Sequence, residues 1–362
     1  MRVIFRADAS VLIGTGHIMR CLTLAEALRK EGAYCKFVTR DHPGHLLDQI
    51  MARGFDAVLL KSPIGQTNTA PPVHAAWSGV PWQQDAEETR KAMGSNSDWL
   101  VVDHYAFDSR WQHAITKPGT QIMVIDDLAD RTHKADLLLD QNLGRKANDY
   151  DGLVPEHCKR LIGLRYALLR PEFMAGRAVS LSGRLDRPLR HILISMGGTD
   201  AVDATSLVLS ALRDAALPDD AHLTVVMGSN APALSRVQRL VAEMPWLAEV
   251  VIDVVDMAGL MTEADLAIGA GGGTTWERCC MGLPSIVIST AENQEHSASI
   301  IKKSGAAIFL GSHTDECLHE KLCRSLSQLF CRKNYNELSA SSSRICDGEG
   351  TIRVCNAINQ LS

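Results

Sequence analysis

Residues 266–277 read LAIGAGGGTTWE, in which an apolar run meets three consecutive glycines and then a helical pattern. The run predicts a buried strand, and the glycines predict a turn whose backbone can approach a ligand closely. N–H groups at the start of such a helix are typical of phosphate sites, and a carboxylate one turn later can accept hydrogen bonds from a ribose. The candidate nucleotide-binding residues are Gly271, Gly272, Gly273, Thr274 and Glu277. The alternative is an ordinary βα turn followed by a surface glutamate. No GKS or GKT follows, so we do not expect a magnesium-dependent P-loop.

Similar strand and helix patterns recur on both sides of this stretch. The candidate strands are residues 2–5, 34–39, 57–60, 99–103, 121–126 and 136–140 in the first half, and 191–195, 223–227, 250–252, 266–269, 285–288 and 307–310 in the second. Most of these runs lack polar alternation, as expected for parallel strands covered on both faces. The predicted fold class is α/β, with a doubly wound, Rossmann-like sheet in each half.

The length of 362 residues corresponds to about two domains. Residues 175–190 read AGRAVSLSGRLDRPLR, a Gly-, Ser- and Arg-rich stretch that predicts a linker. We therefore expect an N-terminal domain over residues 1–175, a C-terminal domain over residues 188–349 and a final helix over residues 350–362. Residues 62–82, rich in proline and glycine, predict a long surface loop.

The composition excludes several classes of protein. Lys and Arg number 37 against 42 Asp and Glu, a net charge of -5, which disfavours nucleic acid as a partner. Arg2, Arg6 and Asp8 interrupt the apolar start, and no run reaches the ~18 apolar residues of a membrane span, so we expect a cytoplasmic protein without membrane contact. The ten cysteines form no CxxC pair, and no HxH or HExxH spacing occurs. We expect free thiols, no metal and no cofactor, and no obligate protein partner is evident.

The first glycine loop, GTGHIMR at residues 14–20, lies between a strand and a helix. Met19 occupies the third glycine position of a dinucleotide fingerprint, so NAD binding is not expected. His17 follows Gly14 and Gly16 at a helix N-terminus, where the dipole disfavours imidazolium. A neutral histidine can take a proton from water, so His17 is the candidate general base. The alternative is a histidine that caps the helix or bonds to a neighbouring strand.

Three further loops follow candidate strands. Gly197, a candidate UDP-binding residue, lies in the turn after residues 191–195. Tyr105 follows Asp103 and His104, and Asn293 and Gln294 follow residues 285–289. Polar side chains at these sheet ends could hold sugar hydroxyl or acetamido groups. Local capping of helices is the alternative for Asp103 and Asn293.

Seven ordered motifs together carry a resemblance to a known family. They are GTGHIMR at 14–20, DHY at 103–105, IDD at 125–127, DQN at 140–142, MGGTD at 196–200, GAGGGTTWERCCMGLP at 269–284 and ENQ at 292–294. With them the chain resembles the UDP-sugar hydrolases of pseudaminic acid biosynthesis over nearly its whole length. The second half also resembles the peptidoglycan N-acetylglucosaminyltransferase, a GT-B glycosyltransferase.

The resemblance implies two Rossmann-like domains facing across a cleft, the GT-B type. It implies metal-independent hydrolysis of UDP-2,4-diacetamido-2,4,6-trideoxy-β-L-altropyranose to UDP and the free sugar. It also places the catalytic base at His17, sugar contacts at Tyr105 and Asn293, and the ribose-binding acid at Glu277. By similarity to the GT-B nucleotide site, Val254 and Met257 are candidates for the backbone that contacts uracil. The Pro-rich loop over residues 62–82 is longer than we expect for the family.

We expect in-line attack by a water activated by His17, with inversion at the anomeric carbon. UDP is a good leaving group, so a pair of glycosidase carboxylates is not required. The alternatives are a GT-B glycosyltransferase that uses a UDP-amino sugar, a hydrolysing UDP-N-acetylglucosamine 2-epimerase, and a nucleotide-sugar sensor without turnover. A sensor would not need a base at position 17.

Overall fold

The computed structural model describes residues 1–62, 71–94 and 96–362, without the side chains of residues 292, 293 and 295–297. It divides into two compact units. The first contains Met1–Leu168 together with Glu349–Ser362, and the second contains Leu169–Gly348. Each unit has its own parallel sheet and its own apolar core, as the two halves of the sequence predict.

The first unit alternates strands and helices as expected. Its elements are β1 (Arg2–Ala7), α1 (Gly16–Lys30), β2 (Tyr34–Arg40), α2 (Leu47–Ala52), β3 (Asp56–Leu60), η1 (Ala75–Ser78), α3 (Trp82–Met93), β4 (Trp99–Asp103), α4 (Ser109–Ile115), β5 (Gln121–Ile125), β6 (Leu137–Asp140), η2 (Ala147–Tyr150), β7 (Lys159–Ile162), η3 (Leu164–Tyr166) and α13 (Gly350–Leu361). All six strands expected here are present. The additional strand β7 has the sequence KRLI and lies at the edge of the sheet, paired with β6. Such a short, charged edge strand carries little apolar signal.

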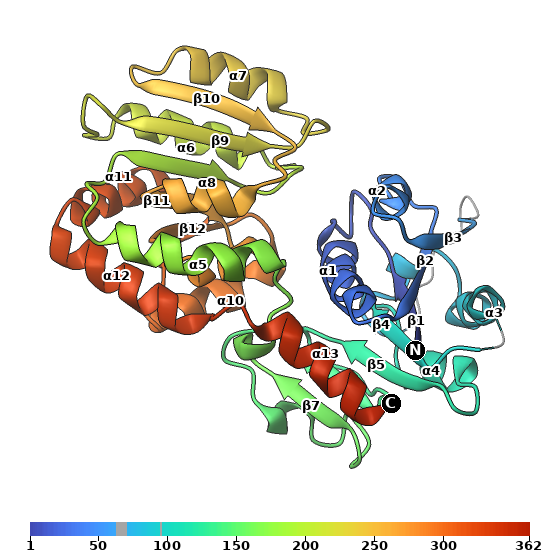
Figure 1. Ribbon diagram of the computed structural model, residues 1–362. Helices are drawn as coiled ribbons and strands as arrows, with labels where there is room; N and C mark the ends of the chain where they lie inside the picture. The colour runs from blue at the N-terminus through green and yellow to red at the C-terminus, as the bar shows by residue number, and fades with distance from the viewer. Residues whose placement is uncertain (63–70, 95) are drawn as a thin grey trace. The chain divides into compact units, whose positions relative to one another are not determined.

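The seven strands found among the described residues of this unit form one sheet in the order β3-β2-β1-β4-β5-β6-β7. Its strand pairs are parallel, with Val3 opposite both Cys35 and Trp99. Helices α1 and α13 bury Leu22 and Ile358 against one face, and α3 and α4 bury Met93 and Trp111 against the other (Figure 1). Burial on both faces explains why the strands lack polar alternation.

The second unit has the same plan with a smaller sheet. Its elements are α5 (Pro171–Arg184), β8 (His191–Ser195), α6 (Ala204–Arg213), β9 (His222–Met227), α7 (Leu234–Ala242), β10 (Leu247–Ile252), α8 (Met257–Glu263), β11 (Leu266–Ala270), α9 (Thr274–Cys280), β12 (Ser285–Ser289), α10 (Glu292–Lys303), β13 (Ile308–Ser312), α11 (Leu318–Leu329) and α12 (Arg332–Ile345). The six strands run parallel in the order β10-β9-β8-β11-β12-β13. Helices α6, α7 and α11 cover one face with Val208, Val237 and Leu322.

The linker expected between Met174 and Arg190 is wrong, because most of this stretch is helix α5. Pro171 stands in the first turn, where its missing N–H costs nothing. The small residues that suggested a linker permit close packing instead: a Cβ at Gly176 would lie 3.3 Å from the Met281 side chain. Ser180 Oγ donates to Met281 O over 2.8 Å, and α5 therefore belongs to the second unit.

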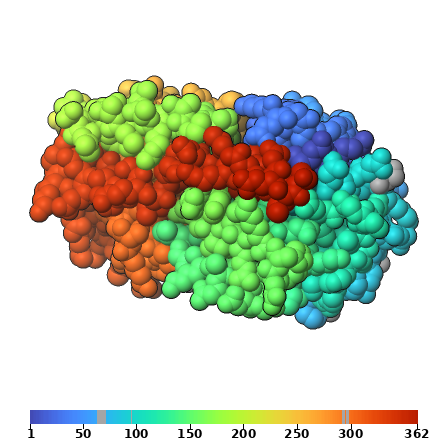
Figure 2. Space-filling view, turned by 60° about the horizontal axis from the view of Figure 1, so that its bottom comes forward, coloured from blue at the N-terminus to red at the C-terminus, as the bar shows by residue number. Residues whose placement is uncertain are grey.

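The final helix expected over residues 350–362 is present as α13 and belongs to the first unit. It packs against α1 and η3, and it forms a dark red ridge beside green residues in the space-filling view (Figure 2). A Cβ at Gly350 would lie 2.2 Å from Ala167 O. The start of α13 therefore packs directly against the backbone at the end of the segment Met1–Leu168. The last residues of the chain thus complete the N-terminal core.

Candidate active site

The first candidate site lies where the strand order of the first sheet reverses. The chain leaves β1 toward β2 on one side, and β4 lies on the other side of β1. In open parallel sheets, ligands bind outside the carboxyl ends of the strands at such a point. The loop with Gly14 and Gly16 follows β1, and Asp103 ends β4. Topology therefore brings the first glycine loop and the DHY motif together.

His17 is the second residue of α1, and its side chain is 9% exposed. Gly14, at φ 81°, closes the turn before it by donating its N–H to Ser10 O over 2.8 Å. The Nδ1 atom of His17 lies 2.6 Å from Asp103 Oδ1 and 3.4 Å from Arg20 Nη2. The shorter contact, to a carboxylate acceptor, places the proton on Nδ1. Nε2, across the ring, is then the atom with a lone pair.

Asp103 is fully buried between two cationic or potentially cationic groups. Arg20 donates from Nε to Asp103 Oδ2 over 2.6 Å, and it also pairs with Asp127 over 2.7 Å. Burial alone would raise the pKa of the Asp103 carboxyl, but Arg20 and then His17 outweigh it and hold the pKa well below its usual range. Asp103 is therefore an anion at neutral pH, and it fixes both the tautomer and the orientation of the imidazole.

The three residues of the DHY motif point in three directions. Asp103 faces His17, and Tyr105 donates its hydroxyl to Asp127 Oδ2 over 2.5 Å while its ring meets His17 edge-on, with centroids 4.7 Å apart. His104 accepts the Ala106 N–H at Nδ1 and turns Nε2 toward Asp8, 3.2 Å away. Tyr105 thus lies beside the candidate base, and the buried His104 contacts Asp8 of the same unit.

The IDD and DQN motifs meet on the next two strands. Asn142 donates from Nδ2 to both Asp127 and Asp140, each over 2.9 Å. Burial, and then the charge of Asp127, raise the pKa of Asp140 to about 6. Asn142 thus holds Asp127 in place, and Asp127 in turn accepts hydrogen bonds from Arg20 and Tyr105. The two motifs therefore support the residues that contact His17.

The second candidate site repeats this topology. The order of the second sheet reverses between β8 and β11, which puts the loop with Gly197 beside the loop over residues 271–273. Among the described residues, the N–H groups of Gly272 and Gly273 donate no backbone hydrogen bond, and both glycines are at least partly exposed. These donors at the start of α9 can bind an anion.

Arg278 supports the glycine loop from below. It is buried, and it donates from Nη2 to Ala270 O over 2.8 Å. A Cβ at Gly269 would lie 2.0 Å from Arg278 Nη1 and 2.8 Å from Ser195 O. Burial lowers the pKa of the Arg278 guanidinium to about 10, which leaves it charged at neutral pH. Because Gly269 has no side chain, the charged guanidinium of Arg278 can pack directly against the backbone that leads into the glycine loop.

Glu277 lies on α9, half-buried, with Oε1 3.8 Å from Arg170 Nη2. Burial raises the pKa of its carboxyl, and Arg170 partly offsets this effect. Arg170 also donates to Val255 O over 3.2 Å, between the candidate uracil residues Val254 and Met257. One side chain thus links the candidate ribose acid to the candidate uracil segment. Asp256 caps α8 by accepting the Gly259 N–H.

The structure places two of the remaining predicted residues, Gln294 and Gly197, in the second unit. Gln294 Oε1 accepts from Thr290 N over 3.1 Å, and a Cβ at Gly271 would lie 3.3 Å from Gln294, so the ENQ segment lies beside the glycine loop. The side chain of Asn293 lies outside the described residues. In the MGGTD motif, Gly197 has φ 95°, and Asp200 accepts the N–H groups of Ala204 and Thr205 at the start of α6.

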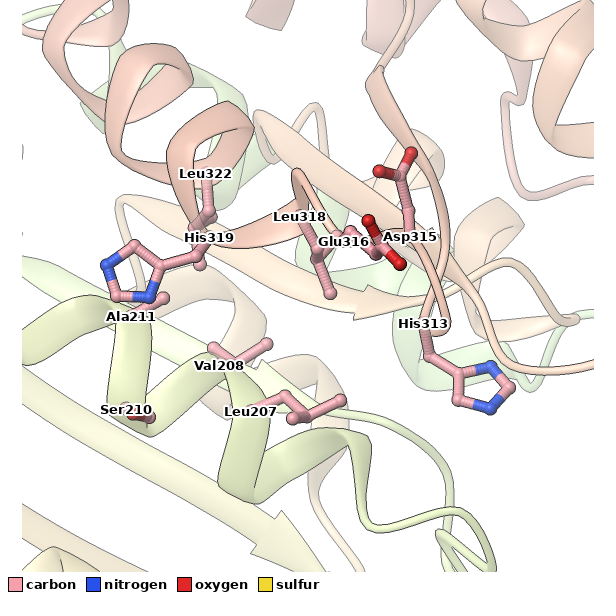
Figure 3. Close-up of a pocket in the computed structure, with 10 residues that line it drawn as sticks. All are labelled: Leu207, Val208, Ser210, Ala211, His313, Asp315, Glu316, Leu318, His319 and Leu322. Carbon is pink, nitrogen blue, oxygen red and sulfur yellow. The ribbon is translucent and has the colours of Figure 1, made fainter.

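A separate pocket of about 180 Å³ lies between α6 and α11 of the second unit. Its lining includes His313, Asp315, Glu316 and His319. Figure 3 shows that the imidazoles of His313 and His319 lie at opposite ends of the pocket and do not converge. His319 instead pairs with Asp214 over 3.0 Å. We assign this pocket no part in the chemistry.

The supporting residues of the base were not identified from the sequence. Arg20 stands within GTGHIMR, one turn after His17, and Asp103 and Asp127 stand within DHY and IDD, but only the fold reveals that they form one network. The aromatic residues His74 and Trp77 beside Tyr105 were also missed. A histidine and an arginine at i and i+3 on one helix face are the signal that could have suggested a shared partner.

Comparison with protein families gives a match in the second half of the chain. Residues 191–348 match the glycosyltransferase family 28 C-terminal domain. The matched region begins at β8 and ends with the second unit, and it includes the glycine loop and Glu277.

Two relatives are similar in sequence. The UDP-2,4-diacetamido-2,4,6-trideoxy-β-L-altropyranose hydrolase of Campylobacter jejuni is 28% identical over 84% of this chain and 97% of its own length. The spore coat polysaccharide biosynthesis protein SpsG of Bacillus subtilis is 33% identical over 55% of this chain, and the chain spans 58% of that relative's length. The resemblance to the UDP-sugar hydrolase is confirmed.

Solved structures establish the fold. The chain matches MurG of Acinetobacter baumannii with a TM-score of 0.68 and 16% identity, covering 99% of both chains. A Listeria monocytogenes protein assigned as a UDP-N-acetylglucosamine 2-epimerase matches with a TM-score of 0.63 and 14% identity, covering 99% of this chain and 96% of that one. Together with the two parallel sheets, these matches confirm the predicted GT-B fold class.

In the described parts of the chain, no helix is both long and apolar enough to span a bilayer. Over the same residues, no three His, Cys, Asp or Glu side chains are grouped so as to hold a metal ion.

Proposed function

We propose that this chain hydrolyses UDP-2,4-diacetamido-2,4,6-trideoxy-β-L-altropyranose to UDP and the free sugar. The observation that carries the proposal is the pair His17 and Asp103, in which the buried carboxylate holds Nδ1 at 2.6 Å and leaves Nε2 as a base. The name of the Campylobacter relative and the family 28 match support an enzyme that acts on a nucleotide sugar. A sensor without turnover would have no use for such a pair.

In the proposed reaction, Nε2 of His17 takes a proton from a water as the water oxygen attacks the anomeric carbon. The bond from that carbon to the phosphate oxygen breaks, UDP leaves, and the configuration inverts. Asp103 stabilises the imidazolium that forms, since it is an anion in direct contact with Nδ1. The proton later passes to solvent.

The second unit has the proposed role of binding UDP. The N–H groups of Gly272 and Gly273 and the start of α9 would stabilise the charge that develops on the diphosphate. Glu277 would accept from the ribose hydroxyls, and the backbone near Val254 and Met257 would contact uracil. Because UDP carries away the bonding electrons as a stable anion, the step needs neither a general acid nor a metal.

The roles of the other residues follow from their positions. Tyr105, whose ring touches His17, would position the sugar or the water, and the backbone at Gly14 and Gly16 would leave room for them. Gln294 lies beside the glycine loop, next to the UDP phosphates in this proposal, and Asn293 would contact the sugar. We also propose that the protein acts in the cytoplasm, without membrane, nucleic acid or protein partner.

Time-resolved NMR tests this function directly. The native chain is incubated with the UDP-sugar and EDTA, without any acceptor, and the anomeric signals of the released sugar are followed. We expect UDP and the inverted anomer to appear first. Release that stops in EDTA would contradict the metal-independent step, and retention of configuration would contradict direct attack by water.

Two alternative functions have support of their own. The family 28 match and the likeness to MurG fit a glycosyltransferase, and the epimerase-assigned structure fits a hydrolysing 2-epimerase. The same NMR experiment separates them: a transferase would release UDP only after an acceptor is added, and an epimerase would change the configuration at C2 of the sugar.

A further inference from the structure

The segment from Pro71 to Trp82 is built into the first unit, although the sequence predicts a surface loop there. It contains η1, and Ala75 and Val80 are buried in it. The buried Ser78 Oγ lies 2.8 Å from Ala75 O and 2.6 Å from Val80 O. Arg110 of α4 donates to Pro71 O over 2.6 Å. The described part of this loop is therefore held in one conformation.

The segment places two aromatic side chains beside the candidate base. The Trp77 ring stacks on the Tyr105 ring, with centroids 5.4 Å apart and an interplanar angle of 24°. His74 lies 4.7 Å from Trp77 and 5.5 Å from Tyr105 between ring centroids. The Trp77 centroid is 6.4 Å from that of His17, with the rings at 77°. We call His74, Trp77 and Tyr105 the aromatic wall.

The outer members of the aromatic wall keep exposed surface. Tyr105 is 8% exposed, whereas His74 and Trp77 are only half-buried. Within the described residues, the ring nitrogens of His74 and Trp77 make no hydrogen bond. Burial lowers the pKa of His74, so its ring is neutral at pH 7. The wall thus presents uncharged aromatic surface.

This surface lies within reach of a sugar whose anomeric carbon is attacked by the water bound to His17. A water bound to Nε2 would be ~3 Å from the base, and the reacting carbon a further ~3 Å away. The Asp103 contact occupies Nδ1, so the attacking water must bind at Nε2, and the Trp77 ring centroid lies 6.4 Å from the centroid of the same imidazole. A pyranose ring held there extends as far as the aromatic wall.

We propose that Trp77, assisted by His74, is a specificity-determining residue that packs against the apolar edge of the substrate sugar. The inference rests on the proposed function. The expected substrate has a C6 methyl group and two acetamido methyl groups, and these C–H groups fit an aromatic face. A 6-hydroxyl group packed over these ring faces would lose water without gaining a partner, because the ring nitrogens of His74 and Trp77 point outward in the ring planes, and this disfavours ordinary hexoses. The residue acts through binding and takes no part in proton transfer.

Steady-state kinetics of UDP release test the proposal with Trp77→Ala, Trp77→Phe and the control Val73→Ala. Val73 is 86% exposed in the same segment. We expect Trp77→Ala to raise KM about 10-fold with a small effect on kcat, because it removes contact made equally in the ground and transition states. Trp77→Phe should show only a small part of this increase in KM, and Val73→Ala should have the KM of the native chain. Affinity for UDP alone should be unchanged in every variant.

A KM for Trp77→Ala within about twofold of the native value would overturn the proposal. Should that variant fail to fold, as judged by its melting temperature, His74→Ala provides the test, with an expected rise in KM of about threefold. An unchanged KM in His74→Ala would then overturn the proposal.

A binding measurement separates this proposal from the hydrolase assignment. In saturation-transfer NMR with the free 2,4-diacetamido-2,4,6-trideoxy sugar, we expect strong signals from the methyl groups with the native chain and weak ones with Trp77→Ala. If the native chain binds the sugar in this manner but releases no UDP, the hydrolase function fails and the aromatic wall stands. If methyl saturation is equal in both proteins, the aromatic wall fails.

Discussion

His17 Nδ1 lies 2.6 Å from Asp103 Oδ1, although the two residues are 86 positions apart in the sequence. His17 is the second residue of the helix that follows β1, and Asp103 ends β4, the strand next to β1. The contact determines which nitrogen carries the proton, and it therefore determines which nitrogen can act as a base. The chemistry that we propose depends on this one pair.

Replacement of His17 by alanine should lower turnover ~10²- to 10⁴-fold, the usual cost of losing a general base. Affinity for UDP should stay the same, since its proposed site lies in the other unit. Titration calorimetry with UDP and the NMR assay measure the two effects separately. His113→Gln, an exposed histidine of the same unit, is the control and should keep full activity. Near-normal turnover in His17→Ala would remove this residue from the role of base.

Asp103→Asn should reduce turnover by ~10²-fold or more, because an amide no longer specifies the proton on Nδ1 or stabilises the imidazolium. UDP affinity again reports whether the effect is local. The double variant His17→Ala, Asp103→Asn should be no slower than His17→Ala alone, because the two residues act as one unit. Additive losses would show that Asp103 acts independently of the base.

The same substitution should change how stability depends on pH. Asp103 has a depressed pKa in the folded state, so its contribution to stability is present above the ordinary value of about 4 and is lost as the pH falls toward the folded pKa. The native chain should lose up to ~1.4 kcal/mol per pH unit from this group below pH ~4. Urea unfolding at a series of pH values should show a shallower acid dependence in Asp103→Asn. Equal slopes would mean that another carboxylate causes the acid loss.

Glu277→Gln should weaken UDP binding, because it replaces a carboxylate acceptor at the proposed ribose site with an amide. The loss should be about 10-fold, as expected for one hydrogen bond to a charged group. Glu320→Gln, on the exposed surface of α11, is the matched control. If UDP binds Glu277→Gln as tightly as the native chain, the ribose is held elsewhere.

Gly269→Ala should destabilise the protein by at least about 1–3 kcal/mol, because its Cβ would meet both a buried guanidinium and Ser195 O. At Gly272, a Cβ would meet nothing within 4 Å, so Gly272→Ala should leave the free energy of unfolding nearly unchanged. Denaturant unfolding compares the two variants. Equal stability would indicate that the loop can shift to accept the added methyl group.

Much of the architecture could be predicted from local pattern. Apolar runs without alternation identified twelve strands of the two parallel sheets, and glycine turns identified the loops at their carboxyl ends. The pattern failed at α5, where small residues that allow tight packing on Met281 were interpreted as a linker. Composition alone does not distinguish a flexible stretch from a helix that needs small side chains for close contact.

The sequence by itself determined the fold class, the two glycine loops and the candidate residues His17, Tyr105 and Glu277. Tertiary structure alone decided which side chains meet: Asp103 with His17, Arg20 with Asp127, and Trp77 with Tyr105. The physical reason is that periodicity reports on the contact of a residue with its own sheet or helix. The partners of a buried charge come from neighbouring strands distant in sequence, and strand order fixes them.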